Sequence, residues 1–166
     1  MSRLSLALFL SALTLTIAFW SAGCRESVNE DREVDGPIPE VFSMDGSSME
    51  PTISDGDQLR ISNYGDRSPQ RGDVVLFRFP ADTERQFIKR IIAGPGETVE
   101  LRDGLVFIDG SPIEEPYITG RAYYSYGPEK IPANNYFVLG DNRNSSYDSH
   151  VWGFVPRENI IGRVNK

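Results

Sequence analysis

The sequence contains one cysteine, Cys24, and one histidine, His150, among its 166 residues. A single cysteine excludes an intrachain disulfide, and no cluster of cysteine and histidine ligands for a metal can be assembled. Basic residues are also few: 17 lysines and arginines stand against 24 acidic residues, for a net charge of -7. This balance argues against nucleic acid as a partner, which requires a basic face or stripe. Gly94-Pro95-Gly96 is too short for a phosphate-binding loop, so no cofactor or metal is expected.

Long apolar runs are missing except at the N-terminus, where residues 4–23 carry no charge and are flanked by Arg3 and Arg25. A membrane-spanning helix needs about 20 such residues, and a cleaved signal segment needs fewer. The run ends in Ser21-Ala22-Gly23-Cys24, which resembles a lipoprotein processing site that would leave Cys24 lipidated. Residues 1–24 are therefore a signal or anchor segment. Whether it is retained or removed, the rest of the chain is predicted to lie on the extracytoplasmic side of the cell membrane.

Residues 25–40 are polar and acidic, contain two prolines and show no apolar period, which predicts a linker. Residues 41–166 form short β-rich runs separated by Gly, Pro and Asp turns, so we expect one mainly β domain. Asp103-Gly104 predicts a two-residue hairpin turn, and Pro51 suits a single helical turn beginning at Ser48. The predicted strands are 58–62, 73–79, 86–93, 98–102, 105–108, 136–139 and 160–164.

Two segments suggest chemistry. Ser48-Met49-Glu50-Pro51-Thr52 offers a nucleophile, and Phe87-Ile88-Lys89-Arg90-Ile91-Ile92 places a lysine among apolar neighbours. A serine hydroxyl is a weak nucleophile until a base accepts its proton, and a lysine can act as that base only when desolvation keeps it neutral. Holding it neutral near pH 8 requires its pKa to fall by two or more units from about 10.4. The pair therefore indicates a serine/lysine hydrolase.

Further segments occur in a fixed order. Arg71-Gly72-Asp73-Val74-Val75 lies between the serine and lysine segments, and Gly94-Pro95-Gly96-Glu97 follows the lysine. Near the end come Gly140-Asp141-Asn142-Arg143-Asn144-Ser145-Ser146-Tyr147-Asp148-Ser149 and Trp152-Gly153. With the serine and lysine segments, this set resembles the ordered boxes of type I signal peptidases. These are membrane-bound endopeptidases that remove signal peptides. The resemblance covers about residues 44–164. It implies a catalytic core of antiparallel sheets, with a short inserted β region at about 98–132.

The resemblance also implies roles for individual residues. Ser48 would be the nucleophile, Lys89 its general base, and Ser146 a second serine that orients the lysine amine. Asp141 with Arg90 would form a structural ion pair. The family pairs the aspartate at Asp148 with an arginine two residues later, where this sequence has His150. We therefore interpret His150 as a partner of Asp148 and not as the base of a serine/histidine triad.

A second departure concerns the oxyanion hole. Some members of the family have a serine or threonine two residues before the nucleophile, where this sequence has Gly46. The Ser48 amide is then expected to be the main donor to the developing negative charge. The form Asp45-Gly46-Ser47-Ser48-Met49 resembles that of many single-anchor signal peptidases.

The resemblance implies cleavage after small residues, typically alanines, at the first and third positions before the bond of an extended peptide. Val41, Phe42, Met44 and the apolar residues around Lys89 are candidates to line the corresponding pockets, although for any one of them a position in the core is the stronger interpretation. The expected partners are exported preproteins and membrane lipid. Two alternatives remain: a LexA-like self-cleaving Ser/Lys protease, which the export segment disfavours, and a catalytically silent peptide-binding lipoprotein, which has no need for Ser48, Lys89 and Ser146 together.

Overall fold

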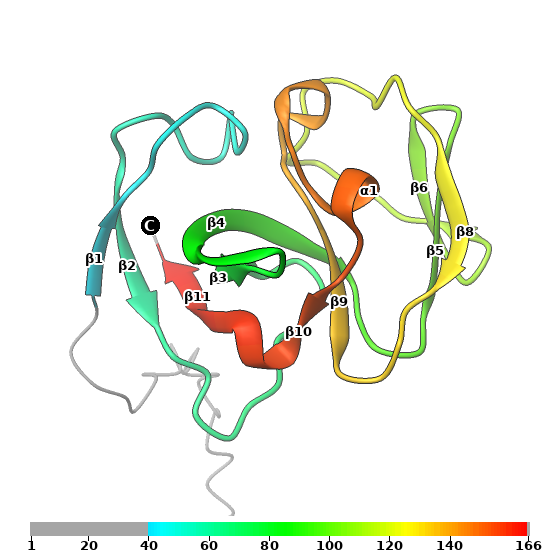
Figure 1. Ribbon diagram of the computed structural model, residues 1–166. Helices are drawn as coiled ribbons and strands as arrows, with labels where there is room; N and C mark the ends of the chain where they lie inside the picture. Colours follow the sequence, from blue (N-terminus) through cyan, green and yellow to red (C-terminus); the bar gives the residue numbers. More distant parts are fainter. Residues whose placement is uncertain (1–39, 166) are drawn as a thin grey trace, which may run out of the picture. The chain divides into compact units, whose positions relative to one another are not determined.

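The computed structural model describes residues 40–165, which form two antiparallel sheets and three short helices (Figure 1). The predicted signal or anchor segment, Cys24 and nearly all of the predicted linker lie outside the described residues. The last predicted linker residue, Glu40, is the first residue of a strand. No helix within residues 40–165 is long and apolar enough to cross a membrane.

The larger sheet has seven strands in the order β1-β2-β11-β3-β4-β9-β10. Its central strands are predominantly buried: β3 reads Val-Val-Leu-Phe-Arg-Phe, and the last six residues of β4 are all buried. The bounds are β1 Glu40–Ser43, β2 Gln58–Ser62, β3 Val74–Phe79, β4 Asp82–Ala93, β9 Asn135–Leu139, β10 Val155–Pro156 and β11 Ile160–Asn165.

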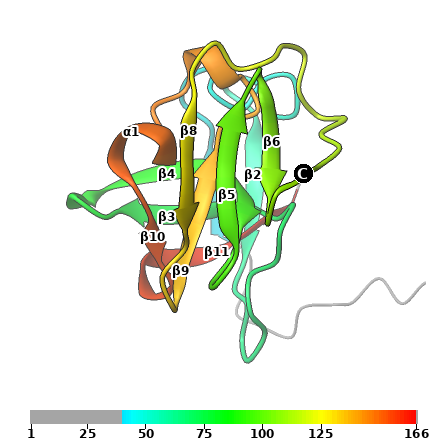
Figure 2. The same ribbon diagram turned by 90° about the vertical axis from the view of Figure 1, so that its right-hand side faces the viewer.

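The smaller sheet has four strands in the order β7-β6-β5-β8 and lies within the predicted inserted region (Figure 2). Its bounds are β5 Thr98–Arg102, β6 Leu105–Ile108, β7 Ser111–Pro112 and β8 Tyr126–Lys130. Asp103 and Gly104 connect β5 to β6 as a two-residue turn with φ angles of 54° and 72°. Those angles are the left-handed values that such a turn requires, so the hairpin prediction is confirmed.

The mainly β prediction is confirmed, with differences at particular elements. β4 begins at Asp82, four residues before the predicted start at Gln86. The sequence did not predict this extension, because residues 82–86 are exposed and have no alternating apolar pattern. β8 was not predicted, because it contains Gly127 and Pro128 and its last four residues are exposed. Proline is tolerated in β8 because it is an edge strand.

The three short helices are η1 Arg143–Ser145, α1 Ser149–Trp152 and η2 Arg157–Asn159. The helical turn predicted to begin at Ser48 is wrong as a helix: residues 48–52 form a turn. The Ile53 amide donates to the Met49 carbonyl, but the next residue makes no hydrogen bond of the same spacing within residues 40–165. A helix consists of repeated bonds of this spacing.

Three apolar clusters hold the sheets together. One joins the ends of β4 and β9 to the smaller sheet through residues such as Ile92, Phe137 and Val99. The second lies beneath the turn that carries Ser48 and includes Met49, and the third includes Phe77. The second half of β4, from Ile88 onward, is thus packed against apolar side chains and removed from water.

Candidate active site

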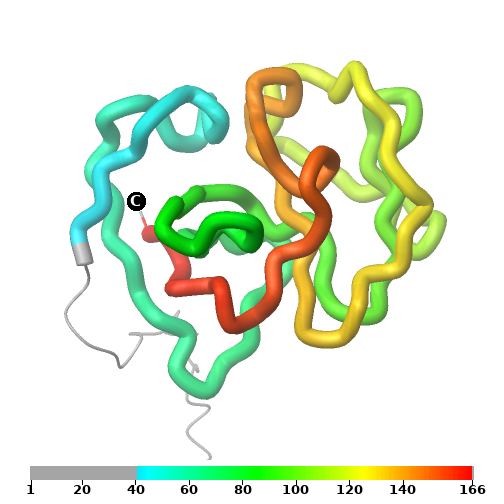
Figure 3. The backbone as a smooth tube through the Cα atoms, in the orientation of Figure 1, coloured from blue at the N-terminus to red at the C-terminus, as the bar shows by residue number. Residues whose placement is uncertain are grey.

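Ser48 lies in the turn that follows β1, and its neighbour Met49 anchors that turn. The Met49 side chain is fully buried in the second apolar cluster, which leaves Ser48 at the surface of the core. The loop after β9 supports the turn from the other side, because the Asn142 amide donates to the Ser48 carbonyl at 3.1 Å. The cyan turn and the orange loop, far apart in the sequence, therefore lie side by side (Figure 3).

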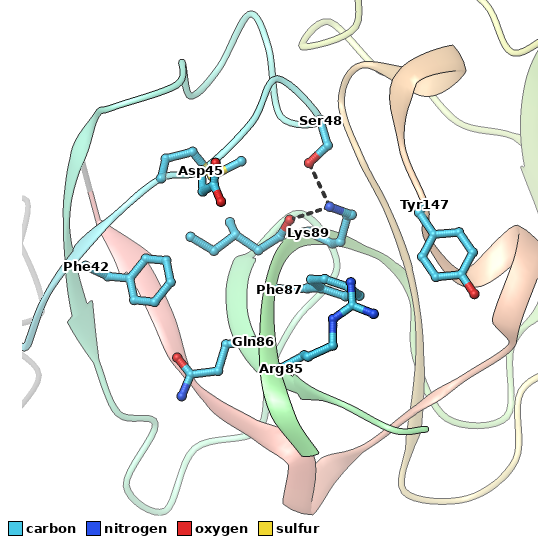
Figure 4. A pocket seen from close by; sticks show the side chains of 10 residues that line it. Phe42, Asp45, Ser48, Arg85, Gln86, Phe87, Lys89 and Tyr147 are labelled. Carbon is cyan, nitrogen blue, oxygen red and sulfur yellow. Dashed lines mark hydrogen bonds between the residues drawn. The ribbon is translucent and has the colours of Figure 1, made fainter. Parts of the chain in front are cut away.

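Lys89 projects from β4 toward Ser48 (Figure 4). Its Nζ lies 2.7 Å from Ser48 Oγ and donates to the Ile88 carbonyl at 3.0 Å. Only 4% of Lys89 is exposed. This burial lowers the lysine pKa to about 8, although the negative charges of Asp148 and Asp141 partly oppose the shift. The nucleophile and a lysine of lowered pKa are thus in hydrogen-bonding reach, as a general base requires.

Asp141 and Arg90 form the predicted ion pair. The guanidinium donates to both carboxylate oxygens, at 2.8 Å from Nε and 2.7 Å from Nη2. Thr52 Oγ1 also donates to Asp141 at 2.5 Å, and Arg90 donates to the Gly72 carbonyl at 2.8 Å. Four segments that the sequence singled out separately are therefore joined around one buried ion pair.

His150 contacts Asp148, as the sequence predicted. Its Nδ1 lies 2.6 Å from Asp148 Oδ1, and its ring stacks on Tyr124 with a centroid distance of 3.7 Å. The other oxygen of Asp148 accepts from the Gly140 amide at 2.9 Å. Ser48 is held by Lys89 and not by the imidazole, so the arrangement is not that of a serine/histidine triad.

The hydrogen bond expected between Ser146 and the Lys89 amine is not formed. Ser146 Oγ is buried and has no hydrogen-bond partner among residues 40–165. The hydroxyl nevertheless lies close to the nucleophile's turn. A Cβ added to Gly140 would be 2.3 Å from Ser146 Oγ and 2.4 Å from the Ser48 carbonyl oxygen. Gly140 thus allows Ser146 and Ser48 to approach the same point.

Gly46, two residues before the nucleophile, has a φ angle of 90°, a left-handed conformation that favours glycine. It offers no side-chain donor for an oxyanion. The Ser48 amide donates no hydrogen bond to the part of the chain that the structure describes. This amide is therefore available for a ligand oxygen.

Sequence reasoning missed the contribution of the inserted region. Glu115 pairs with both terminal nitrogens of Arg143, and these side chains are 5% and 0% exposed. Tyr117 donates to Glu115 at 2.8 Å, and its ring lies 4.0 Å from the guanidinium carbon of Arg90. Glu115 and Tyr117 belong to no recognisable motif. The weak signal in the sequence was the frequency of tyrosine in residues 114–130, which are otherwise mostly polar.

The dyad opens into a cleft lined by Phe42, Met44 and residues of β4. Phe42 and Asp45 lie on one side of this cleft and β4 on the other (Figure 4). Val41, also considered as a lining residue, is 63% exposed and is not part of the cleft. Both walls offer strand edges without a partner among residues 40–165, because β1 pairs there only with β2, and β4 pairs with β9 only from Arg90 onward. No group of three or more candidate metal ligands occurs within residues 40–165.

The remaining residues that line the cleft are polar, aromatic or aliphatic: Asp45, Ser48, Arg85, Gln86, Phe87, Ile88, Lys89 and Tyr147.

A family model described as signal peptidase, peptidase S26, matches residues 37–166. Signal peptidase I of Leptolyngbya laminosa is 46% identical over 137 residues, which cover 76% of this chain and 67% of the relative. A probable signal peptidase I of Synechocystis sp. is 46% identical over 135 residues, covering 76% of this chain and 62% of the relative. The chain thus spans about two thirds of the length of these relatives.

The solved structure of a signal peptidase I from Enterococcus faecalis matches with a TM-score of 0.54 and 32% sequence identity, covering 60% of this chain and 98% of that chain. This match confirms the predicted mainly β fold of antiparallel sheets, of which the structure has two within residues 40–165. Because the family model spans most of the sequence and the relatives share close to half of the aligned residues, the resemblance is also confirmed. The chain belongs to the signal peptidase I family of peptidase S26, the serine endopeptidases that remove signal peptides.

Proposed function

We propose that Ser48 and Lys89 are the residues that carry out signal-peptide cleavage in this chain. The observation that supports the proposal most directly is the 2.7 Å separation of Lys89 Nζ from Ser48 Oγ, with the lysine buried. Neutral Lys89 accepts the hydroxyl proton as Ser48 Oγ attacks the scissile carbonyl. The Ser48 amide stabilises the oxyanion, and Lys89 then returns the proton to the leaving amine. Water activated by the same lysine releases the acyl group.

The neighbouring groups act as supports. The ion pair of Asp141 and Arg90 holds the loop after β9 against β4. Asp148 accepts a hydrogen bond from the Gly140 amide and contacts His150, and these two interactions hold the same loop in place. Ser146 orients the lysine amine once substrate is bound, since catalytic hydrogen bonds often tighten only in the complex.

The substrate is an extended peptide of an exported preprotein, with small residues at the first and third positions before the bond. It adds as a strand between the unpaired edges of β1 and β4, and main-chain hydrogen bonds supply much of its affinity. Phe42, Met44 and Ile88 restrict the space for its side chains. The catalytic region acts at the outer face of the cell membrane, tethered through residues 1–24 as a helix or through a lipidated Cys24.

The test is cleavage of a preprotein with an Ala-x-Ala site by the full chain in detergent or vesicles. Ser48→Ala and Lys89→Ala should each lower kcat by at least ~10³-fold. Ser47→Ala and Lys130→Ala are matched controls, because both residues are exposed and lie outside the cleft. Near-normal cleavage by either dyad variant would contradict the assignment.

The same assay separates the alternatives. A wild-type chain that binds the preprotein without cutting it would be a silent binder, and one that cuts only itself would be a self-cleaving protease. The anchor is settled by the mass of the mature protein. An unmodified chain that retains Met1 would exclude lipid on Cys24.

A further inference from the structure

Arg85 is a cation on the wall of the cleft and has no carboxylate partner among the residues that the structure describes. It lies in the exposed half of β4 and lines the same cleft as Ser48 and Lys89. Its guanidinium carbon rests 5.1 Å from the ring centre of Phe87 and 5.8 Å from that of Phe79. It forms no salt bridge within residues 40–165. The two rings hold this charge at the cleft without neutralising it.

The charge is close enough to the dyad to contact substrate. Lys89 Nζ lies 5.6 Å from the same Phe87 ring centre, so the two cations are no more than about 11 Å apart. An extended peptide rises about 3.3 Å per residue, so Arg85 is within three or four residues of the scissile bond.

The free edge of β4 and the lining of the cleft indicate on which side of the scissile bond the peptide residues near Arg85 lie. Beyond Lys89 the edge of β4 is occupied by β9, and the unpaired edge runs back toward Asp82. The proposed function places the small residues before the bond against Phe42, Met44 and Ile88, which line the same cleft as Arg85. The peptide residues before the bond therefore run along this edge past Arg85.

The alternation of side chains along β4 narrows the position further. Gln86 and Arg85 project to opposite sides of the strand (Figure 4). The small side chains, at the first and third positions before the bond, face Phe42, Met44 and Gln86. Because side chains alternate along a strand, the second and fourth residues before the bond face Arg85.

The other charged and polar groups of the cleft agree with this placement. Tyr147 lies on the same side as Arg85: its ring centre is 6.1 Å from that of Phe79, and its phenol supplies a second donor. Asp45 lines the opposite wall beside Met44 and repels an acidic side chain there. Only the Arg85 side of the cleft is therefore complementary to a carboxylate.

We infer that Arg85 is a specificity-determining residue that favours preproteins with Asp or Glu two or four residues before the scissile bond. This inference rests on the proposed function of the cleft. It adds a charge preference to the requirement for small residues. The preference is modest, because an ion pair exposed to water contributes little.

The test compares peptides with Glu or Gln at the second, at the fourth, or at a control position two residues after an Ala-x-Ala site. At low salt, kcat/KM should be roughly two- to fivefold higher for Glu at the second or fourth position. High salt should reduce this ratio toward one. In Arg85→Gln the ratio should be near one, in Arg85→Glu it should invert, and Arg85→Lys should retain most of it.

The matched control is Arg102→Gln. Arg102 also rests on a ring, 3.9 Å from the centre of Phe107, but lies in the smaller sheet and outside the cleft, so its removal should preserve the ratio. Thermal unfolding checks that each variant is folded. If Gln peptides are cut and no Glu preference appears at low salt, or if Arg85→Gln keeps the preference, the inference is wrong and the proposed function stands. If no peptide is cut, both fail.

Discussion

Lys89 lies where burial disfavours its protonated form. It is 4% exposed, and its hydrogen-bonding partners are the Ser48 hydroxyl and a single carbonyl. Two nearby carboxylates, Asp141 and Asp148, limit the fall of its pKa, because their charges favour the protonated form. The balance holds the pKa at about 8, so a substantial fraction is neutral under mildly alkaline conditions. The charge of this one residue affects both rate and stability.

The first prediction concerns rate. Because Lys89 must be neutral to accept the Ser48 proton, kcat/KM should rise about tenfold per pH unit below the lysine pKa and level off above about 8. The measurement is kcat/KM for a neutral peptide between pH 6 and 9.5. A profile flat across pH 8 would argue against Lys89 as the base.

The second prediction concerns stability. The Lys89 pKa is about 8 in the fold and about 10.4 in the unfolded chain, so the unfolded state binds more protons between these values. The contribution of Lys89 to the free energy of unfolding therefore rises with pH between about 8 and about 10.4, and it is lost below about pH 8. Lys89→Met should increase the free energy of unfolding at pH 7 by up to about 3 kcal/mol.

Urea unfolding at pH 7 and near pH 10.5 measures the effect of Lys89→Met, which should shrink at the higher pH. The exposed Lys130→Met serves as the control and should change little at either pH. Destabilisation of Lys89→Met at pH 7 would mean that the buried amine does not cost the fold free energy.

At the scale of elements, the catalytic arrangement depends on how closely the loop after β9 approaches the turn after β1. The Asn142 amide holds the Ser48 carbonyl, and Gly140 leaves the space in which Ser146 and that carbonyl meet. The loop itself is held by Asp148 through the Gly140 amide. Small changes in backbone position there move the nucleophile.

A third prediction follows for Gly140→Ala. Its added methyl group would lie 2.3 Å from Ser146 Oγ and 2.4 Å from the Ser48 carbonyl, so one of them must shift. A displacement of this kind should lower kcat by about 10²-fold. Gly120→Ala is the control, because a Cβ there meets no atom within 4 Å. Equal kcat values for the two variants would show that the close approach is not needed.

The sequence predicted the elements whose patterns are local. The alternating and apolar runs of β2, β3 and β5, and the Asp103-Gly104 turn, were visible without tertiary information. β8 was not, because a strand containing Gly127 and Pro128 is stabilised by its pairing with β5 and not by its own propensity.

The same distinction applies to the site. Ser48, Lys89 and the pairs Asp141 with Arg90 and Asp148 with His150 could be predicted from ordered motifs. The contacts of Glu115 with Arg143 could not, since they depend on how the inserted region folds back onto the catalytic loop. The position of Ser146 relative to Lys89 also depends on loop geometry, which no motif encodes.

At the scale of the whole molecule, the predicted inserted region is joined to the loop after β9, which supports the turn of Ser48. The buried pair of Glu115 and Arg143 connects it to the loop, and Arg143 also donates to the Gly140 carbonyl at 3.2 Å. Burial disfavours the charged arginine, and the interaction with Glu115 outweighs this, raising the Arg143 pKa. Removing the carboxylate would leave a buried, unpaired charge.

Glu115→Gln is therefore expected to lower the free energy of unfolding by about 3 kcal/mol and to lower kcat through the Gly140 carbonyl. Thermal unfolding and peptide cleavage measure the two effects. Glu100→Gln, which breaks the more exposed pair with Arg102, is the control and should cost less than about 1 kcal/mol. Similar losses in both variants would mean that the buried pair has no special role.

The order of the larger sheet has a consequence for synthesis. Within this sheet β11 separates β2, next to the strand that leads to Ser48, from β3, which pairs with the strand of Lys89. β11 follows every other described strand in the sequence. A nascent chain that already contains Ser48 and Lys89, the proposed catalytic residues, therefore lacks the strand that joins their two halves of the sheet. We expect ribosome-bound chains stalled before residue 160 to be inactive, so that the peptidase acquires activity only after translation has passed its last strand.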